Sequence, residues 1–401
     1  MFNAANTGFM LLAASLVMIM TPGLAFFYGG LVGRSNTLTI MIQSFASMGI
    51  TTVMWWLVGY SLCFSGGSDG IYGNFHLAFL QHVSVSSIYK PTGIPTVVLI
   101  AYQMMFAIIT PALITGAFTN RITFKAYLLF LIVWQVFVYY PFVHMFWGGG
   151  MLAVWGAHDF AGGIVVHASA GFAALASVLY VGKRRAPDAP HNIPFIALGT
   201  GLLWFGWYGF NAGSELAVDH ITAIAFLNTD LAASFAAVTW LFIEWSNAKK
   251  PHFVGLLTGA VAGLATITPA AGYVPIYAAV IIGIAAGVVC YLAVALKNRM
   301  KWDDALDVWG VHGVGGLLGI ILLGVFSSRA INPAGGIGLI HGSGSFLGKQ
   351  IAAGLGCSLY AFVFTYVMLK VINLITPVRV DDVAAEDGLD EHMLGESAYA
   401  M

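Results

Sequence analysis

Long apolar runs, separated by short polar breaks, occupy most of the chain. A transmembrane helix needs about 20 mostly apolar residues to cross a bilayer core about 30 Å thick. By that length the pattern predicts eleven membrane-spanning helices. We place them at residues 8–31, 38–63, 94–117, 125–145, 159–182, 194–216, 221–246, 253–272, 275–297, 305–327 and 346–376. We therefore expect a membrane domain at 1–376 and a short acidic tail at 377–401.

Composition supports a multi-pass membrane protein. Hydrophobic residues make up 59% of the chain and charged residues only 8%, values outside the range of soluble domains. The net charge of −1 provides no basic surface for nucleic acid. The three cysteines, Cys63, Cys290 and Cys357, lie in or at the ends of apolar segments without metal or redox spacing. We expect free buried thiols, no bound metal and no cofactor.

The positions of lysine and arginine predict the orientation. All of the 16 basic residues except Lys90, Arg329 and Lys349 fall on one side of the predicted membrane. Cytoplasmic loops carry the excess of basic residues, so the N-terminus is expected outside and the C-terminus inside. The first basic residue is Arg34, so the first apolar run is interpreted as a retained helix rather than a signal peptide.

The first ten helices divide into two sets of five. The fifth helix of each set begins with a similar motif, DFAG at 159–162 and DVWG at 307–310. An odd number of helices per set gives the two halves opposite orientations, which is typical of inverted repeats with a substrate path at their interface. The expected fold is all-α, a 5+5 inverted repeat followed by a long final helix.

Three ionisable residues lie in these apolar segments: Asp159, His167 and His312. An ionisable group inside a membrane is costly and usually functional. Imidazole can both donate and accept hydrogen bonds and exchanges these roles near neutral pH, although an interhelical hydrogen bond is the simpler explanation for a single histidine. If Asp159 and Asp307 began their helices at the two membrane boundaries, the rings would differ in depth by roughly 10 Å. Contact between them therefore remains open.

The two aspartates have different expected roles. Both could accept hydrogen bonds from the free N–H groups of a helix start. Asp307 is expected to act only as a cap, whereas Asp159, on the outer side, could also stabilise an entering cation. Asp230 is either a buried hydrogen-bonded acid or a residue at a subunit contact.

Aromatic residues are dense near the outer ends of the third to sixth helices. Most such side chains pack or lie in the interfacial belt. A ring face can also replace part of a cation's hydration, worth about 2 kcal/mol when desolvated. The residues concerned are Tyr102, Phe106, Trp147, Trp207, Tyr208 and Phe210.

Several motifs resemble one known family. The stretch DFAGGIVVHASAGFAALASVLYVGKR resembles the signature of the ammonium transporter family, the Amt/Mep/Rh proteins, most closely its bacterial and archaeal Amt members. The resemblance extends over nearly the whole chain in matching order. It includes PGLAFFYGG (22–30), WGGG (147–150), WFGWYGFNAGS (204–214), TPAAGY (268–273), DVWGVHGV (307–314), GLD (388–390) and GESAY (395–399).

The resemblance implies an ammonium transporter of the cell membrane, not an enzyme, assembled as a homotrimer with one path per subunit. Ammonium or ammonia would be the substrate, with methylammonium as an analogue. By motif position, the outer recruitment site would comprise Trp147, Phe106 and Ser214, with Gln103 on the approach. Phe106 and Phe210 would form a gate, Asp159 would support the ion and its deprotonation, and His167 and His312 would relay the proton.

The tail of the family is a cytoplasmic regulatory segment that meets PII-type (GlnK-like) signalling proteins, which implies such a partner here. The family commonly has histidine before the Gly-Glu pair of the tail, whereas this chain has Leu394. Regulatory contacts at that position are therefore expected to differ.

Three other functions remain open from the residues alone. Inverted repeats also occur in ion-coupled transporters of larger amines or amino acids. A membrane redox or metal enzyme could use His144, His158, His167 and His312, although the chain has no HExxH or CxxCH spacing. An ammonium sensor would be expected to carry an output domain, and none follows the last helix.

Overall fold

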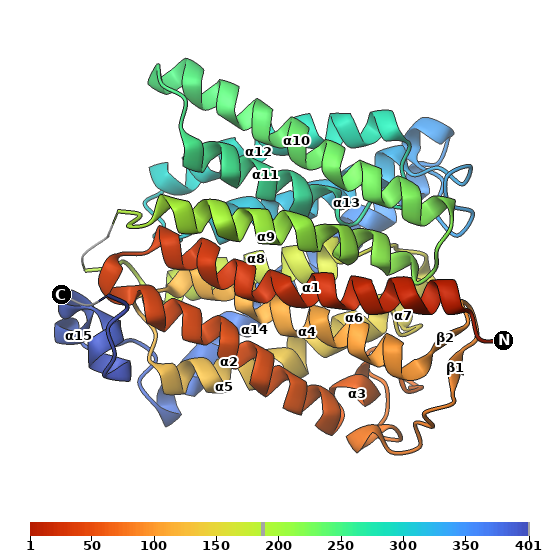
Figure 1. Cartoon of the computed structure of the whole chain (residues 1–401), viewed down its shortest axis with the longest axis horizontal. Helices are drawn as coiled ribbons and strands as arrows, with labels where there is room; N and C mark the ends of the chain where they lie inside the picture. Colours follow the sequence, from red (N-terminus) through yellow and green to blue (C-terminus); the bar gives the residue numbers. More distant parts are fainter. Residues whose placement is uncertain (186–188, 400–401) are drawn as a thin grey trace.

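The computed structural model describes residues 1–185 and 189–399. Within them, ten helices, some with internal kinks, are long and apolar enough to cross a membrane, and the shorter apolar helix at 253–267 makes an eleventh. This confirms the predicted all-helical membrane fold. Figure 1 shows one bundle with the two chain termini at opposite ends. The final residues of the expected tail, 400–401, lie outside the described part.

The helices and the single small sheet have the following bounds: α1 (Ala4–Leu31), α2 (Thr37–Met54), α3 (Tyr60–Phe64), β1 (Ile88–Tyr89), β2 (Ile94–Pro95), α4 (Thr96–Phe118), α5 (Phe124–Trp134), α6 (Tyr140–Phe146), α7 (Met151–Trp155), α8 (Ser169–Val181), α9 (Ile193–Ala212), α10 (His220–Ala248), α11 (Phe253–Ile267), α12 (Ile276–Arg299), α13 (Val314–Phe326), α14 (Gly344–Ile375) and α15 (Asp382–Asp387).

Four of the membrane helices contain a π-helical turn, which the apolar pattern did not predict. The turns lie at Trp55–Gly59, Gln135–Tyr139, Gly163–Ala168 and Trp309–Gly313. A π turn inserts an extra residue into a helix and frequently marks a functional site. The last two turns contain His167 and His312 respectively.

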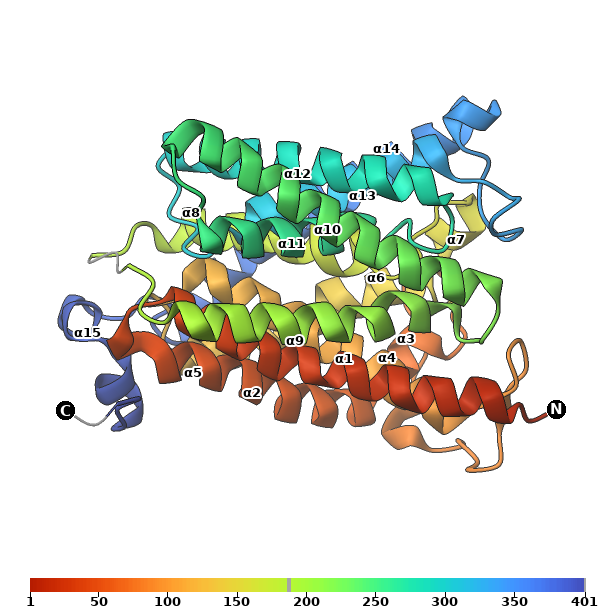
Figure 2. The same cartoon turned by 45° about the horizontal axis from the view of Figure 1, so that its top comes forward.

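The first helices of the two halves, α1 and α9, pack against each other along their length, as Figures 1 and 2 show. Gly23 of α1 lies against Leu202 and Gly199 of α9, and Gly209 of α9 lies against Ala13. Contacts that move back along one helix as they move forward along the other mean that α1 and α9 are antiparallel. The opposite orientation predicted for the two halves is therefore present.

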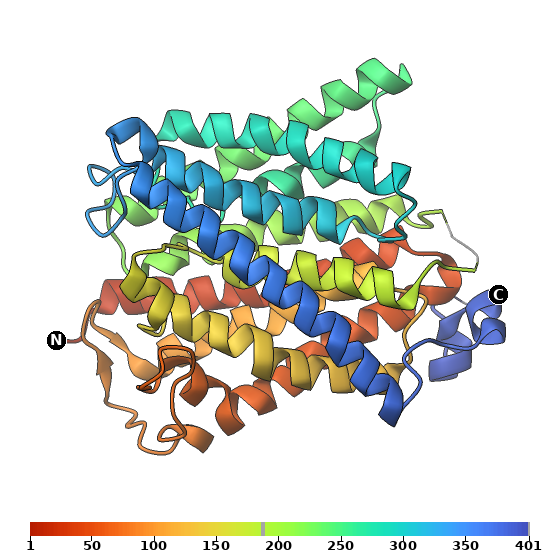
Figure 3. The same ribbon diagram turned by 180° about the vertical axis from the view of Figure 1, so that it is seen from behind.

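Outside this bundle, α14 crosses one face diagonally (Figure 3). A short hairpin at the end of the loop at 64–93 pairs β1 with β2, which directly precedes α4. At the opposite end, the carboxylate of Asp390 in the tail accepts hydrogen bonds from the backbone N–H groups of Leu38 and Thr39 at the start of α2. The tail is thus attached to the end of the bundle where most basic residues lie.

Two smaller expectations are also resolved. Cys63, Cys290 and Cys357 are free and buried, as predicted. Asp230 on α10 accepts hydrogen bonds from the Trp204 indole (3.1 Å) and the Tyr208 hydroxyl (2.6 Å) of α9. The expected hydrogen bonding of Asp230 is therefore confirmed, but the residue is partly exposed and not buried.

The α1–α9 contact gives a test of packing. A Cβ at Gly199 would overlap the backbone of Phe27, whereas a Cβ at Gly201 on the same helix meets nothing within 4 Å. We expect Gly199→Leu to destabilise the protein by about 3 kcal/mol or more and Gly201→Leu to have little effect. Thermal unfolding in detergent measures both; equal melting temperatures would contradict the packing argument.

Candidate functional site

The fifth helix of each half crosses the other at paired glycines. A Cβ at Gly171 would overlap the backbone of Gly313, and a Cβ at Gly316 would lie 2.8 Å from the Cβ of His167. Gly171 follows His167 by four residues, and Gly316 follows His312 by the same interval. The two helices therefore make the same contact reciprocally, and each glycine admits the partner helix next to a histidine.

This crossing brings the two histidine rings together. Nδ1 of His167 lies 3.3 Å from Nδ1 of His312, with ring centroids 5.2 Å apart and an angle of 18° between the planes. Both side chains are buried. The rings are in contact, so the difference of roughly 10 Å in depth, which assumed that both aspartates lie at the membrane boundaries, does not occur. Asp159 is itself buried, only 5% exposed.

Asp159 closes the start of the fifth helix. Its Oδ1 accepts from the N–H groups of Gly162 (2.9 Å) and Gly163 (2.6 Å), and its Oδ2 accepts from Ile164 (2.8 Å) and Val165 (3.0 Å). Gly162 has a φ of +121°, a conformation that favours glycine, and turns the chain so that these donors converge. The cap expected at Asp159 is therefore confirmed.

The expected cap at Asp307 is wrong. The N–H of Trp309 donates to Asp304 (2.7 Å), whereas Asp307 forms an ion pair with Lys297 (2.5 Å). Asp304 precedes His312 by eight residues, the same interval that separates Asp159 from His167. Aligning the DFAG and DVWG motifs shifted the repeat by three residues. Burial raises the pKa of Asp304 to about 6, against the opposing charge of Lys297.

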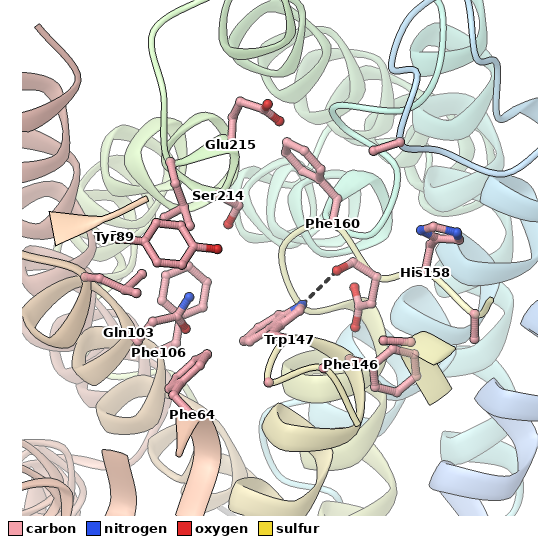
Figure 4. Close-up of a pocket in the computed structure, with 18 of the residues that line it drawn as sticks. Phe64, Tyr89, Gln103, Phe106, Phe146, Trp147, His158, Phe160, Ser214 and Glu215 are labelled. Carbon is pink, nitrogen blue, oxygen red and sulfur yellow. Dashed lines mark hydrogen bonds between the residues drawn. The ribbon is translucent and has the colours of Figure 1, made fainter. Parts of the chain in front are cut away.

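A cavity of about 600 Å³ opens on the N-terminal end of the bundle (Figure 4). Its lining includes Trp147, Phe106, Ser214, Gln103 and Asp159, so the predicted outer residues do lie together. The Trp147 indole donates to the carbonyl of Asp159 (2.8 Å), which fixes the ring beside the cavity. Oε1 of Gln103 is buried and has no hydrogen-bond partner within the described residues.

Aromatic rings lead from this cavity to the histidines. The Phe106 ring lies 5.8 Å from Trp147 and 4.2 Å from Phe210, and Phe210 lies 6.0 Å from His167, all between centroids. Below the phenylalanines is a lumen of about 10 Å³ that both histidines line. A water molecule needs about that volume, so the lumen has room for one molecule of that size.

A third cavity of about 60 Å³ lies beyond the histidines. His312, Phe27 and Val261 line both this cavity and the lumen, and Asp307 lines its far side. Outer cavity, lumen and inner cavity thus form a series across the bundle, with the phenylalanine pair at the first boundary and His312 at the second.

Trp207, which the sequence placed only among the outer aromatic residues, lines the lumen. It stacks on His167 at 5.4 Å, and its indole donates to Thr268 (2.9 Å). The neighbouring Tyr208 points the other way and stacks on Phe226. The sequence could have distinguished Trp207 from Tyr208. Residues three apart share a helix face, so Trp207 and Phe210 are expected on one face of the helix and Tyr208 on another.

The four histidines considered for a metal or redox site do not form one cluster. A ring nitrogen of His144 lies 2.9 Å from the carbonyl oxygen of Cys63, and His158 packs against Tyr273 and Phe346. Within residues 1–185 and 189–399, no group of three His, Cys, Asp or Glu side chains is arranged to hold a metal ion.

Comparison with known proteins identifies the family. The model of the Ammonium Transporter Family matches residues 8–399. The chain belongs to the ammonium transporter family. An ammonium transporter of Bacillus subtilis is 43% identical over 98% of both chains, and ammonium transporter Amt1 of Archaeoglobus fulgidus is 40% identical over 98% of this chain and 99% of its own.

Solved structures of ammonium transporters share the fold. The crystal structure of Candida albicans Mep2 has a TM-score of 0.89 and 36% identity, covering 95% of this chain and 87% of its own. A protein described as a sensor Amt protein has a TM-score of 0.88 and 27% identity, covering 98% of each chain. Family membership makes the chain a multi-pass protein of the cell membrane and an ammonium transporter rather than an enzyme.

The cap at Asp159 predicts a large effect of removing one carboxylate oxygen. In Asp159→Asn an amide NH₂ would replace an oxygen that accepts two backbone N–H bonds, which should cost about 2–3 kcal/mol. In Asp230→Asn both hydrogen bonds can remain, because they share Oδ1. Thermal unfolding in detergent should show the larger loss for Asp159→Asn, and equal losses would contradict the proposed cap energetics.

Proposed function

We propose that this ammonium transporter binds ammonium in the outer cavity, removes a proton there, and passes ammonia through the lumen while His167 and His312 carry the proton separately. The observation that carries this proposal is the contact of the two imidazoles, 3.3 Å apart, beside a lumen with room for a single small molecule. Methylammonium is proposed as a second substrate.

The outer cavity has the groups that a small monovalent cation needs. The faces of Trp147 and Phe106 supply cation–π attraction. The free Oε1 of Gln103 and the Ser214 hydroxyl oxygen supply acceptors for the N–H groups of the ion. The Ser214 hydroxyl donates to the carbonyl of Phe210 (2.9 Å), and the Tyr102 hydroxyl lies 3.3 Å from the Ser214 oxygen, so one lone pair of that oxygen remains available to a ligand.

The free-energy cost of desolvating a charge explains why ammonium would be deprotonated before it enters the lumen. Moving a charge into a narrow apolar passage removes its hydration shell, and the few contacts in the passage do not compensate for that free-energy cost. Ammonium can lose a proton and enter as a neutral molecule, whereas potassium cannot. The separation therefore provides selectivity between two ions of the same charge.

Asp159 is proposed to support the ion from the wall of the cavity. Its carboxylate is held in place by four backbone N–H groups and also lines the cavity wall. A fixed negative charge at this position stabilises a cation and the proton that it releases. Asp159 is thus assigned both structural and electrostatic roles.

The histidine pair is proposed as the proton relay. Each imidazole has one nitrogen facing the other ring, so a proton can be shared between them without a net charge on both. Nε2 of His167 is buried without a partner among the described residues, so it is free to exchange a hydrogen bond with a molecule in the lumen.

We further propose a homotrimer and a regulatory role for residues 377–401. The Arg379 guanidinium donates to the carbonyls of Val181 and Lys183, and the N–H of Val380 donates to the carbonyl of Arg121. The tail therefore contacts two loops at this end of the helices, where a PII-type protein is the proposed partner. The similarity to a sensor Amt protein makes sensing a second candidate, which a direct measurement of transport distinguishes.

The first functional prediction concerns the relay. His167→Ala removes one of the two imidazoles and should abolish selective ammonium-driven current in proteoliposomes. Currents after ammonium, methylammonium and potassium pulses measure the effect, and a retained melting temperature and oligomeric state show that the variant is folded. Selective current like that of the wild type would refute the relay.

The second prediction concerns recruitment. Trp147→Leu removes the cation–π surface of the outer cavity, worth about 2 kcal/mol when desolvated, and should raise the half-saturating ammonium concentration roughly tenfold or more. Trp56→Leu is the control, because Trp56 is half-exposed and does not line the cavity. An unchanged concentration dependence in Trp147→Leu would remove the recruitment role.

A further inference from the structure

The outer cavity has two carboxylates in its described lining and neither lysine nor arginine. Both oxygens of Asp159 already accept backbone hydrogen bonds. The second carboxylate, Glu215, follows Ser214 directly in the chain. It forms no hydrogen bond or ion pair with any other described residue, so its charge is not compensated by a protein donor.

The position of Glu215 is set by the end of α9. A short 3₁₀ turn, Gly213–Glu215, follows the helix, and Leu216 then adopts a left-handed conformation. The next helix, α10, is capped by Asp219 instead, which accepts from the N–H groups of Ile221 and Thr222. The local fold therefore makes no evident use of the Glu215 carboxylate. Figure 4 shows this side chain at the edge of the cavity near Phe160.

We infer that Glu215 attracts cations into the outer cavity and thereby lowers the ammonium concentration needed to fill the aromatic site. This inference rests on the function proposed for that cavity. A fixed charge at the mouth of a low-dielectric cleft raises the local concentration of the opposite ion. The effect is confined to about 8–10 Å at physiological ionic strength, a range suited to a residue on the cavity wall.

The attraction is not specific for ammonium. A carboxylate concentrates sodium and potassium as well, so Glu215 sets the occupancy of the cavity while discrimination stays with the proton-removal step. The charge acts before the ion is desolvated. Its removal should therefore change the apparent KM and leave the maximal current close to that of the wild type.

The test compares Glu215→Gln with the wild type in proteoliposomes, using ammonium-pulse currents at about pH 8. We expect the apparent KM to rise roughly two- to fivefold at about 10 mM salt and the difference to shrink at about 150 mM salt. Glu215→Asp keeps the charge and should remain near the wild-type KM.

Asp69→Asn is the matched control. Asp69 is an exposed carboxylate of the loop at 64–93 that does not line the cavity, and its Oδ1 accepts from Ile71 and Tyr72, a role that asparagine retains. It removes the same unit charge elsewhere on the outer face. A KM shift equal to that of Glu215→Gln would show a general surface field and overturn the inference.

Two further outcomes would also overturn it. One is an unchanged KM in Glu215→Gln at low salt, and the other is a loss of maximal current without a KM change, which indicates a structural role. Failure of the proposed function gives a different result: Trp147→Leu would then leave the KM unchanged. If Glu215→Gln leaves the KM unchanged while Trp147→Leu raises it, only the role of Glu215 is refuted and the proposed function stands.

Discussion

The arrangement of the pathway depends on the close approach of two helix backbones at the centre of the bundle. Gly171 and Gly316 each face the other helix where no Cβ fits. Because each glycine follows its histidine by one helical turn, the close crossing also places the two imidazoles in contact. Larger residues would separate the helices, so the same contact supports both the packing of the two halves and the geometry of the histidine pair.

Polar groups inside the bundle are mostly matched by partners, and this makes the exceptions informative. Asp159 and Asp304 accept backbone hydrogen bonds at the start of the two crossing helices. Buried polar atoms without a partner are costly unless they serve another purpose. Gln103 Oε1 and His167 Nε2 are two such atoms, and both residues line the series of cavities.

Much of the fold could be predicted from the sequence, because bilayer thickness fixes the length of an apolar helix and basic residues favour one side. The opposite orientation of the halves and the placement of His167 and His312 inside apolar helices followed from the same pattern. The π turns could not be predicted, since they do not alter the apolar runs. The correct equivalence of Asp159 with Asp304 was missed because the DVWG motif resembles DFAG more closely than the residues after Asp304 do.

The narrow lumen has a consequence for the energy supply of the cell. A continuous file of water through a membrane protein would let hydrogen ions hop from molecule to molecule and would dissipate the proton-motive force. Here the closely packed Phe106 and Phe210 rings and the lumen of about 10 Å³ beside the imidazoles leave no room for such a file among the described residues. Hydrogen ions would then cross only by way of the proposed imidazole relay, so the proton-motive force would be spent on transport and not on an open water file.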